Sequence, residues 1–113
     1  MHEMGITQGI ISSAVEAAEG EGATKINEID ISVGELTEIV EDALQFAFEA
    51  LRTGTMASEA TLVVTHVPAR SKCMMCATEF THDKYDMTCP KCESFMIETL
   101  TGRELRIDSI DID

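Results

Sequence analysis

Four cysteines stand in two closely spaced pairs in the second half of the chain. Their spacing is Cys73-x2-Cys76-x12-Cys89-x2-Cys92. A Cys-x2-Cys pair forms a tight turn that points two thiolates at one centre, and two such pairs complete a tetrahedral four-sulfur site. This is the closed coordination that a structural zinc ion prefers. The spacing therefore predicts that Cys73, Cys76, Cys89 and Cys92 bind one Zn²⁺.

Three other uses of these cysteines compete with zinc. Two disulfides are disfavoured in a reducing compartment, and a redox pair is disfavoured because two pairs lie so close in the chain. Iron in a rubredoxin-like site is the serious rival, since tetrahedral sulfur coordination suits both metals. An aromatic shell keeps such an iron site dry, and only Tyr85, Phe80 and Phe95 lie near.

The segment around the cysteines depends on its metal. It has roughly 25 residues, well below the ~40 that usually fold without a staple, so metal binding is expected to drive its folding. Arg70, Lys72 and Lys91 flank the pairs and partly offset the negative charge of four thiolates. A closed four-sulfur site leaves no coordination position for a substrate, so the function must lie elsewhere.

The N-terminus offers a second set of metal donors. Histidine at position 2 is too bulky for efficient removal of the initiator methionine, so we expect Met1 to remain. Its α-amine, together with the amide and imidazole of His2 and either the amide or the carboxylate of Glu3, forms a nitrogen-rich set that suits Ni(II) or Cu(II). A histidine at position 2 also occurs by chance in many proteins. Glu3 has an alternative role as an acidic residue in the first turn of a helix, where the helix dipole favours negative charge.

The net charge narrows the range of partners. The chain of 113 residues has 8 Lys and Arg against 21 Asp and Glu, a net charge of −13. Such a surface repels phosphate backbones and anionic lipids, so we expect neither nucleic-acid nor membrane binding. The acidity serves solubility or attracts a basic partner. No signal peptide opens the chain and no apolar run reaches the ~20 residues that span a bilayer, so we expect a cytoplasmic protein.

The hydrophobic pattern indicates alternating helices and strands. The periodicity predicts helices over 4–18 and 41–52, and strands over 29–33, 60–67, 95–100 and 104–112. The last strand changes phase near Asp108 and Ser109, which predicts a β-bulge. Residues 70–94 contain the cysteines and little hydrophobic material. Most of the seven methionines are expected to fill the core.

These elements predict an α/β protein. Two helices pack on a small mixed three-stranded sheet, and a zinc-ribbon-like lobe is inserted between two strands. The expected division places an α/β domain in residues 1–69 plus 104–113 and the zinc-binding lobe in residues 70–103.

Several motifs together resemble one known family over the whole chain. They are the opening Met-His-Glu, Val33-Gly34-Glu35-Leu36, the run from Ala43 to Thr55, Val67-Pro68-Ala69-Arg70, and Gly102-x-Glu104-Leu105-x-Ile107. In order and spacing they resemble the HypA/HybF family of hydrogenase nickel-incorporation proteins. Family knuckles often have a glycine after the second cysteine, where a positive φ is easiest, and this chain has Ala77 and Glu93 instead.

The resemblance implies a nickel metallochaperone for [NiFe]-hydrogenase maturation and not an enzyme. It implies transferred Ni²⁺ at Met1, His2 and Glu3, and structural Zn²⁺ at the four cysteines. The implied partners are a GTP-hydrolysing nickel-insertion accessory protein and the hydrogenase large-subunit precursor, and some members also serve urease maturation. Whether the protein forms a homodimer is left open.

Other functions make different demands on the residues. A zinc-ribbon adaptor needs no nickel at His2, and a rubredoxin-like carrier needs iron. A hydrolase is disfavoured because no nucleophile or phosphate-loop signature appears.

The other two histidines are not among the expected nickel donors. His66 is expected to be a packed or surface residue of a strand. His82 is expected to be a loop residue, and the less favoured alternative for His82 is a ligand of a second metal site.

Overall fold

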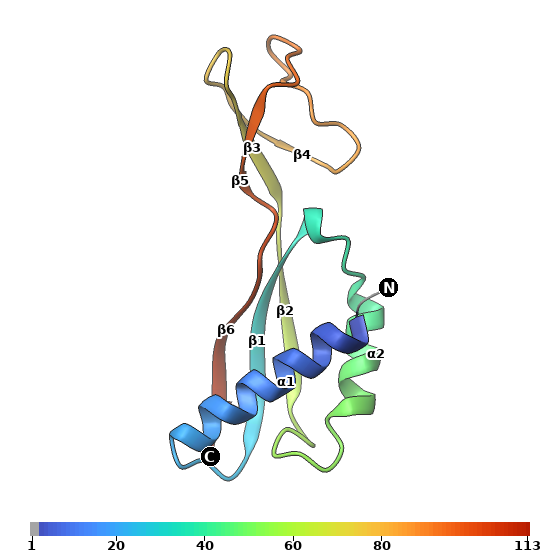
Figure 1. Ribbon diagram of the computed structural model, residues 1–113, viewed down its shortest axis with the longest axis vertical. Coiled ribbons are helices and arrows are strands. Elements are labelled where there is room, and N and C mark those ends of the chain that lie inside the picture. Colours follow the sequence, from blue (N-terminus) through green and yellow to red (C-terminus); the bar gives the residue numbers. More distant parts are fainter. Residues whose placement is uncertain (1–2) are drawn as a thin grey trace. The chain divides into compact units, whose positions relative to one another are not determined.

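The computed structural model describes residues 3–113 (Figure 1). Its helices are α1 (Glu3–Gly20), the short 3-10 helix η1 (Glu35–Thr37) and α2 (Glu41–Leu51). Its strands are β1 (Ile26–Gly34), β2 (Thr61–Val67), β3 (Ala69–Cys73), β4 (Glu79–His82), β5 (Ile97–Thr101) and β6 (Leu105–Ile112). The strands form two three-stranded sheets, β2-β1-β6 and β4-β3-β5.

The first sheet is mixed, as expected from the sequence. β1 and β2 run parallel and are connected through α2, whereas β6 returns antiparallel to β1 (Figure 1). The Asp113 N–H donates to the Lys25 carbonyl at 2.9 Å, just before β1 begins. The Gly34 N–H donates to the Glu104 carbonyl at 2.8 Å, where β1 ends. This antiparallel register makes the end of the chain part of the same sheet as its first strand.

The two helices cover the apolar side of this sheet. Ile10, Ile11, Ala14 and Ala18 recur at helical spacing and are buried, as the periodicity predicted. α2 packs against α1 and buries Leu44, Ala47 and Phe48, while β1 contributes the buried Ile29 and Ile31 to the core of the first unit. Both predicted helices and the strands of this sheet are therefore confirmed.

The phase change in β6 is visible in its hydrogen bonds. The Ser32 hydroxyl donates to the Asp108 carboxylate, and the Ser109 hydroxyl donates to the Asp30 carboxylate at 3.1 Å. Asp30 and Ser32 lie on one face of β1 because they are two residues apart. The consecutive residues Asp108 and Ser109 therefore both reach that face, as a bulge at this point produces.

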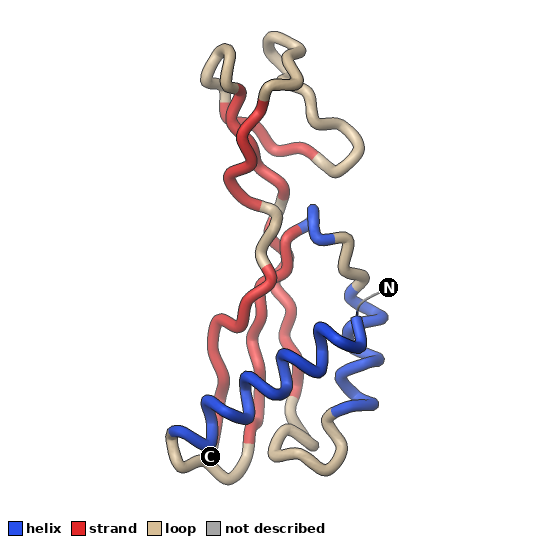
Figure 2. The backbone as a smooth tube through the Cα atoms, viewed as in Figure 1, coloured by secondary structure: helices blue, strands red, loops and turns tan. Residues whose placement is uncertain are grey.

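The second sheet contains two strands that the hydrophobic pattern did not predict. β3 pairs antiparallel with both β4 and β5 (Figure 2). In β3, small buried residues alternate with charged exposed ones. The buried residues are Ala69, Ser71 and Cys73, and the exposed ones are Arg70 and Lys72. Because Ala and Ser are weakly apolar, this alternation has no strong hydrophobic signal.

The chain divides into two compact units. Of the described residues, the first unit contains 3–32, Ile39–Thr65 and Arg106–Asp113, and the second contains Val33–Glu38 and His66–Leu105. The domain boundaries expected from the sequence stay a prediction. Within residues 3–113, neither helix combines the length and the apolar character that crossing a bilayer would require.

Two glycines lie in close contact within the second unit. A Cβ added to Gly34 would overlap the carbonyl group of Gly102 and lie 2.6 Å from the Arg103 nitrogen. Gly34 has φ −79° and ψ 147°, a conformation open to every residue, so steric closeness is what requires glycine here. The Leu36 N–H donates to the Gly102 carbonyl at 2.8 Å and holds the two segments together.

We predict that Gly34→Ala destabilises the protein by about 3 kcal/mol, because the backbone atoms opposite the new methyl group cannot give way. Chemical denaturation of the metal-loaded protein measures the change. Gly9→Ala is the matched control, since Gly9 lies in α1 with no atom within 4 Å of its added Cβ. It should stabilise by about 0.5–1 kcal/mol. Equal stability of Gly34→Ala and wild type would contradict the close contact.

Candidate metal centre

The structure brings the four cysteine sulfurs together in the second unit. Cys73 ends β3 and Cys76 follows in the next turn, while Cys89 and Cys92 lie in the turn before β5. The Cys73 and Cys92 sulfurs are 3.5 Å apart, and the Cys76 and Cys89 sulfurs are 3.6 Å apart. All four sulfurs lie within 4.8 Å of one another.

These distances fit a tetrahedral metal ion. With a zinc–sulfur bond of about 2.3 Å, the edge of a regular tetrahedron of sulfurs is about 3.8 Å. The two short sulfur–sulfur distances lie close to this edge. The four cysteines are free thiols and not disulfides. The donor set therefore suits a soft, tetrahedral ion such as Zn²⁺.

The two turns have the same backbone hydrogen bonds. The Ala77 N–H donates to the Cys73 carbonyl at 2.9 Å, and the Glu93 N–H donates to the Cys89 carbonyl at 2.8 Å. Ala77 and Glu93 have φ of 65° and 61°, in the left-handed region that disfavours side chains. The sequence placed these two residues where glycine is common, and the turns adopt the left-handed conformation without it.

Backbone N–H groups also point at the sulfurs. The Met75 N–H donates to the Cys73 sulfur at 3.4 Å, and the Lys91 N–H donates to the Cys89 sulfur at 3.4 Å. Each donor lies two residues after its cysteine, so the two turns are equivalent in this bond as well. Such bonds stabilise thiolate charge, which metal coordination requires.

The acidity of the thiols differs across the cluster. A hydrogen bond with the Thr78 hydroxyl, 3.2 Å from the sulfur, lowers the pKa of Cys76 to about 6. At Cys92 the Ser94 backbone N–H lowers the pKa, but hydrogen bonding to Cys73 and desolvation outweigh it and raise the pKa to about 12. Four adjacent sulfurs cannot all be thiolates without a cation, so a divalent ion would displace the remaining protons.

One aromatic side chain packs against the cluster. Phe80 is buried with Cys73 and Cys89, and Cys76 and Ile97 pack beside them. The other aromatic residues named in the sequence analysis point to solvent, with Tyr85 85% exposed and Phe95 79% exposed. The shell that would keep an iron site dry is therefore reduced to one ring.

The methionines contradict the expectation that they fill the core. None of the described methionines is among the buried core residues. Met74, Met75 and Met96 are 63%, 71% and 58% exposed beside the cysteine turns, and the Met74 N–H donates to the Met96 carbonyl at 2.8 Å. The prediction was wrong because the aliphatic side chains of the first unit already fill its core, so apolar character alone did not place the methionines there.

The structure places His82 at the end of β4 and not in a loop. Its Nε2 lies 2.6 Å from the Ser71 hydroxyl and its Nδ1 lies 2.7 Å from the Asp83 carbonyl. The sequence did not suggest this Ser–His contact, because the two residues meet only through the pairing of β3 with β4. Ser71 is fully buried, so the contact is a structural hydrogen bond. His66 lies exposed on β2, as expected.

Of the three predicted nickel donors, the structure describes Glu3. Met1 and His2 lie outside the described residues. Glu3 begins α1 and is buried, with its carboxylate 3.4 Å from the Val40 N–H at the start of α2. A carboxylate at this position is favoured by the partial positive charge of the N-terminus of α2.

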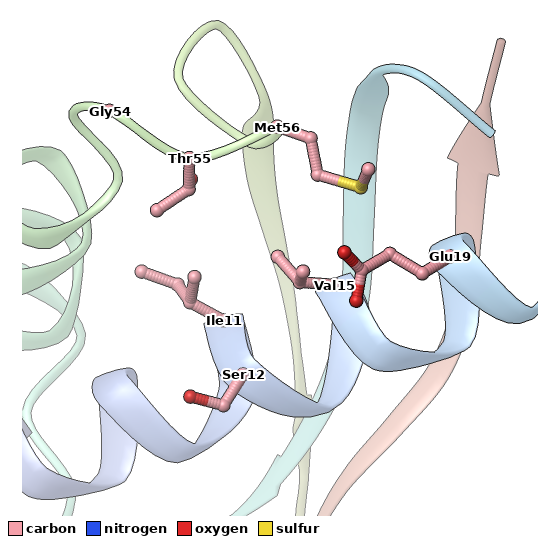
Figure 3. A pocket seen from close by; sticks show the side chains of 7 residues that line it. All are labelled: Ile11, Ser12, Val15, Glu19, Gly54, Thr55 and Met56. Atoms are coloured by element: carbon pink, nitrogen blue, oxygen red, sulfur yellow. The ribbon is translucent and has the colours of Figure 1, made fainter.

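A shallow cleft of about 380 Å³ lies between α1 and the loop after α2 in the first unit. Ile11, Val15 and Met56 form its apolar part, with Ser12 and Glu19 at the side (Figure 3). Its lining contains no cysteine or histidine, and its one soft donor is the Met56 thioether, so the cleft does not supply a set of soft donors for a transition metal.

Comparison with known proteins finds one family over the whole chain. A family model described as hydrogenase/urease nickel incorporation, metallochaperone, HypA, matches residues 1–112. The chain is 40% identical to a hydrogenase maturation factor HypA of Chlorobium luteolum, over 100% of this chain and 97% of that protein. It is 36% identical to the HypA of Geobacter sulfurreducens, over 100% of each.

Solved structures agree with the fold. The solution structure of the Ni metallochaperone HypA from Helicobacter pylori has a TM-score of 0.71 and 24% identity, over 99% of this chain and 97% of that one. A second solution structure of a HypA protein has a TM-score of 0.74 and 25% identity, over 99% and 96%.

We predict that Ala77→Gly and Glu93→Gly each tighten zinc binding about fivefold. Glycine removes a left-handed strain of about 1 kcal/mol from the folded turn. Competition against a chromophoric chelator measures the affinity. Met75→Gly, in the same turn but without a positive φ, is the control and should not tighten binding. Weaker binding in both glycine variants would contradict this account of the turns.

We also predict that Thr78→Val makes zinc binding more sensitive to acid. Loss of the hydroxyl that stabilises the Cys76 thiolate raises its pKa, so protons displace zinc at a higher pH than in wild type. Zinc release during an acid titration, followed with a metal indicator, gives the midpoint. Thr81→Val, at an exposed position of β4, should leave that midpoint unchanged. Coinciding midpoints for Thr78→Val and wild type would show that this hydrogen bond does not tune the site.

Proposed function

The chain belongs to the HypA family of hydrogenase/urease nickel-incorporation metallochaperones, and on this basis we propose that it delivers Ni(II) during maturation of a [NiFe]-hydrogenase. The match over residues 1–112 carries the proposal. The cluster of four sulfurs within 4.8 Å of one another supports it, because these four thiols could hold a resident metal ion while the N-terminal donors hold the cargo.

The resident metal at Cys73, Cys76, Cys89 and Cys92 is Zn²⁺ in this proposal. Four thiolates complete its coordination, so the ion would be structural and would stabilise the fold of the zinc-binding lobe, residues 70–103. The single ring of Phe80 against the cluster favours zinc over a rubredoxin-like iron centre, which needs a drier environment.

Nickel is the cargo, held at Met1, His2 and Glu3 of the nickel-binding domain, residues 1–69 with 104–113. The α-amine, the His2 amide and imidazole, and the Glu3 amide would supply four nitrogen donors, a set that suits Ni(II). The Glu3 carboxylate is already engaged near the Val40 N–H, so its amide is the better fourth donor. Donors at a chain end can be exchanged one at a time, which transfer to another protein requires.

The partners in this proposal are a GTP-hydrolysing nickel-insertion accessory protein and the hydrogenase large-subunit precursor, in the cytoplasm. The net charge of −13 would steer a basic docking surface toward the chain and raise the rate of encounter. A chaperone of this kind catalyses no reaction itself.

The test is nickel calorimetry on protein with its native N-terminus. Wild type should bind one Ni(II), while His2→Ala and a variant with two residues added before Met1 should lose that binding. Zinc, measured in each sample by elemental analysis, should stay bound in all three. Nickel binding should be lost without loss of zinc because the variants change only the N-terminal donors.

Equal nickel binding by all three proteins would overturn the N-terminal site. The chain would then be a carrier with its nickel ligands elsewhere or, if none of the three binds nickel, a zinc-ribbon adaptor.

A further inference from the structure

α2 has apolar side chains beyond the part of its surface that faces the core. Leu44, Ala47 and Phe48 face the core of the first unit and are at most 1% exposed. A second apolar stripe on the helix is formed by Ala43, Phe46 and Ala50. These three residues share one face because Ala43 lies three residues before Phe46 and Ala50 four residues after it.

Phe46 is the centre of this second stripe. Its side chain is 75% exposed, although Phe48, two residues later, is 1% exposed. Ala50 is exposed and Ala43 half-buried. A wide apolar surface on a helix needs cover, and the fold of the first unit buries only the part formed by Leu44, Ala47 and Phe48. Exposed aromatic side chains between small neighbours are typical anchors of protein interfaces.

The charges beside Phe46 are all negative. Asp42 and Glu49 lie one turn before and one turn after Phe46, and neither forms an ion pair with a residue in the described part of the chain. The basic residues of the first unit are engaged elsewhere. Lys25 pairs with Glu59 at 3.6 Å, Arg52 donates to the Ala60 carbonyl at 2.6 Å, and Arg106 pairs with Asp108 at 2.9 Å.

We propose that the outer face of α2, formed by Ala43, Phe46 and Ala50 with Asp42 and Glu49, docks a partner protein. The partner presents an apolar pocket for the Phe46 ring, bordered by Lys or Arg side chains that meet Asp42 and Glu49. The inference rests on the proposed function, because it names the docking surface through which a nickel-handling partner binds the first unit.

Charge argues against a second copy of this chain as the occupant. A symmetric pair of α2 helices would bring two Asp42 and two Glu49 carboxylates together, and like charges across an interface are unfavourable. A basic partner removes the repulsion and adds its own rim contacts.

The experiment measures binding of zinc-loaded, full-length protein to the purified GTP-hydrolysing accessory protein and, separately, to the large-subunit precursor. Phe46→Ala should weaken binding to one of them about tenfold or more, as loss of an aromatic anchor does. Ala50→Lys should weaken the same complex by repelling its basic rim. Phe95→Ala is the matched control, since Phe95 is 79% exposed on the second unit.

The double variant Asp42→Asn, Glu49→Gln tests the charge of the partner. It should slow association and reduce the dependence of the rate on salt, because the two carboxylates would steer the basic rim. An unchanged association rate at low salt would overturn the basic partner. Circular dichroism and nickel calorimetry on each variant should match wild type, since none of these residues binds metal.

The outcomes separate this inference from the proposed function. If Phe46→Ala binds both partners as tightly as wild type, the docking face is wrong while the metallochaperone function stands. If Phe46→Ala and Phe95→Ala weaken binding equally, the docking face is also wrong. If light scattering shows a wild-type dimer that Phe46→Ala dissociates, the occupant is a second copy and the basic partner is excluded. If wild type binds neither partner and no nickel, both proposals fail.

Discussion

The convergence of four cysteine sulfurs on one centre is the constraint on which the second unit depends. Its buried cluster consists of Cys73, Cys89 and Phe80, with Cys76 and Ile97 beside them. Three of these five side chains are themselves cysteines, so the apolar contribution is small. A metal ion bound to four thiolates would supply the stabilisation that a larger core provides elsewhere. The sheet β4-β3-β5 positions the two turns so that their four sulfurs lie within 4.8 Å of one another.

The same unit contains backbone that is constrained in two ways. Ala77 and Glu93 hold a left-handed conformation that their side chains disfavour, and Gly34 and Gly102 approach too closely for any side chain. The two constraints have different origins. The first closes the cysteine turns, whereas the second brings the end of β1 against the segment between β5 and β6. Metal binding can offset the first, while the second requires glycine itself.

In the proposed metallochaperone, the four cysteines hold the structural zinc ion, and the N-terminal residues hold the nickel ion that is transferred. A four-sulfur site holds its ion without an open position, which suits a structural role and not transfer. Of the proposed nickel donors, Met1 and His2 precede α1 in the sequence, and Glu3 is its first residue, with its carboxylate 3.4 Å from the Val40 N–H at the start of α2. The outer face of α2 therefore belongs to the same unit as the donors. A partner docked there would be held on the unit from which it receives nickel.

Local patterns in the sequence determined much of this protein. Cysteine spacing identified Cys73, Cys76, Cys89 and Cys92, which the structure brings together, and hydrophobic periodicity predicted both helices and the mixed sheet, because a helix or strand imposes its own period on the residues it buries. Tertiary structure alone decided the rest. The strands β3 and β4, the Ser71–His82 contact, the approach of Gly34 to Gly102 and the exposure of the methionines and of Phe46 all depend on which distant segments meet. A pattern read along the chain specifies which side of an element is apolar, but only the packing of the other elements decides whether that side is covered.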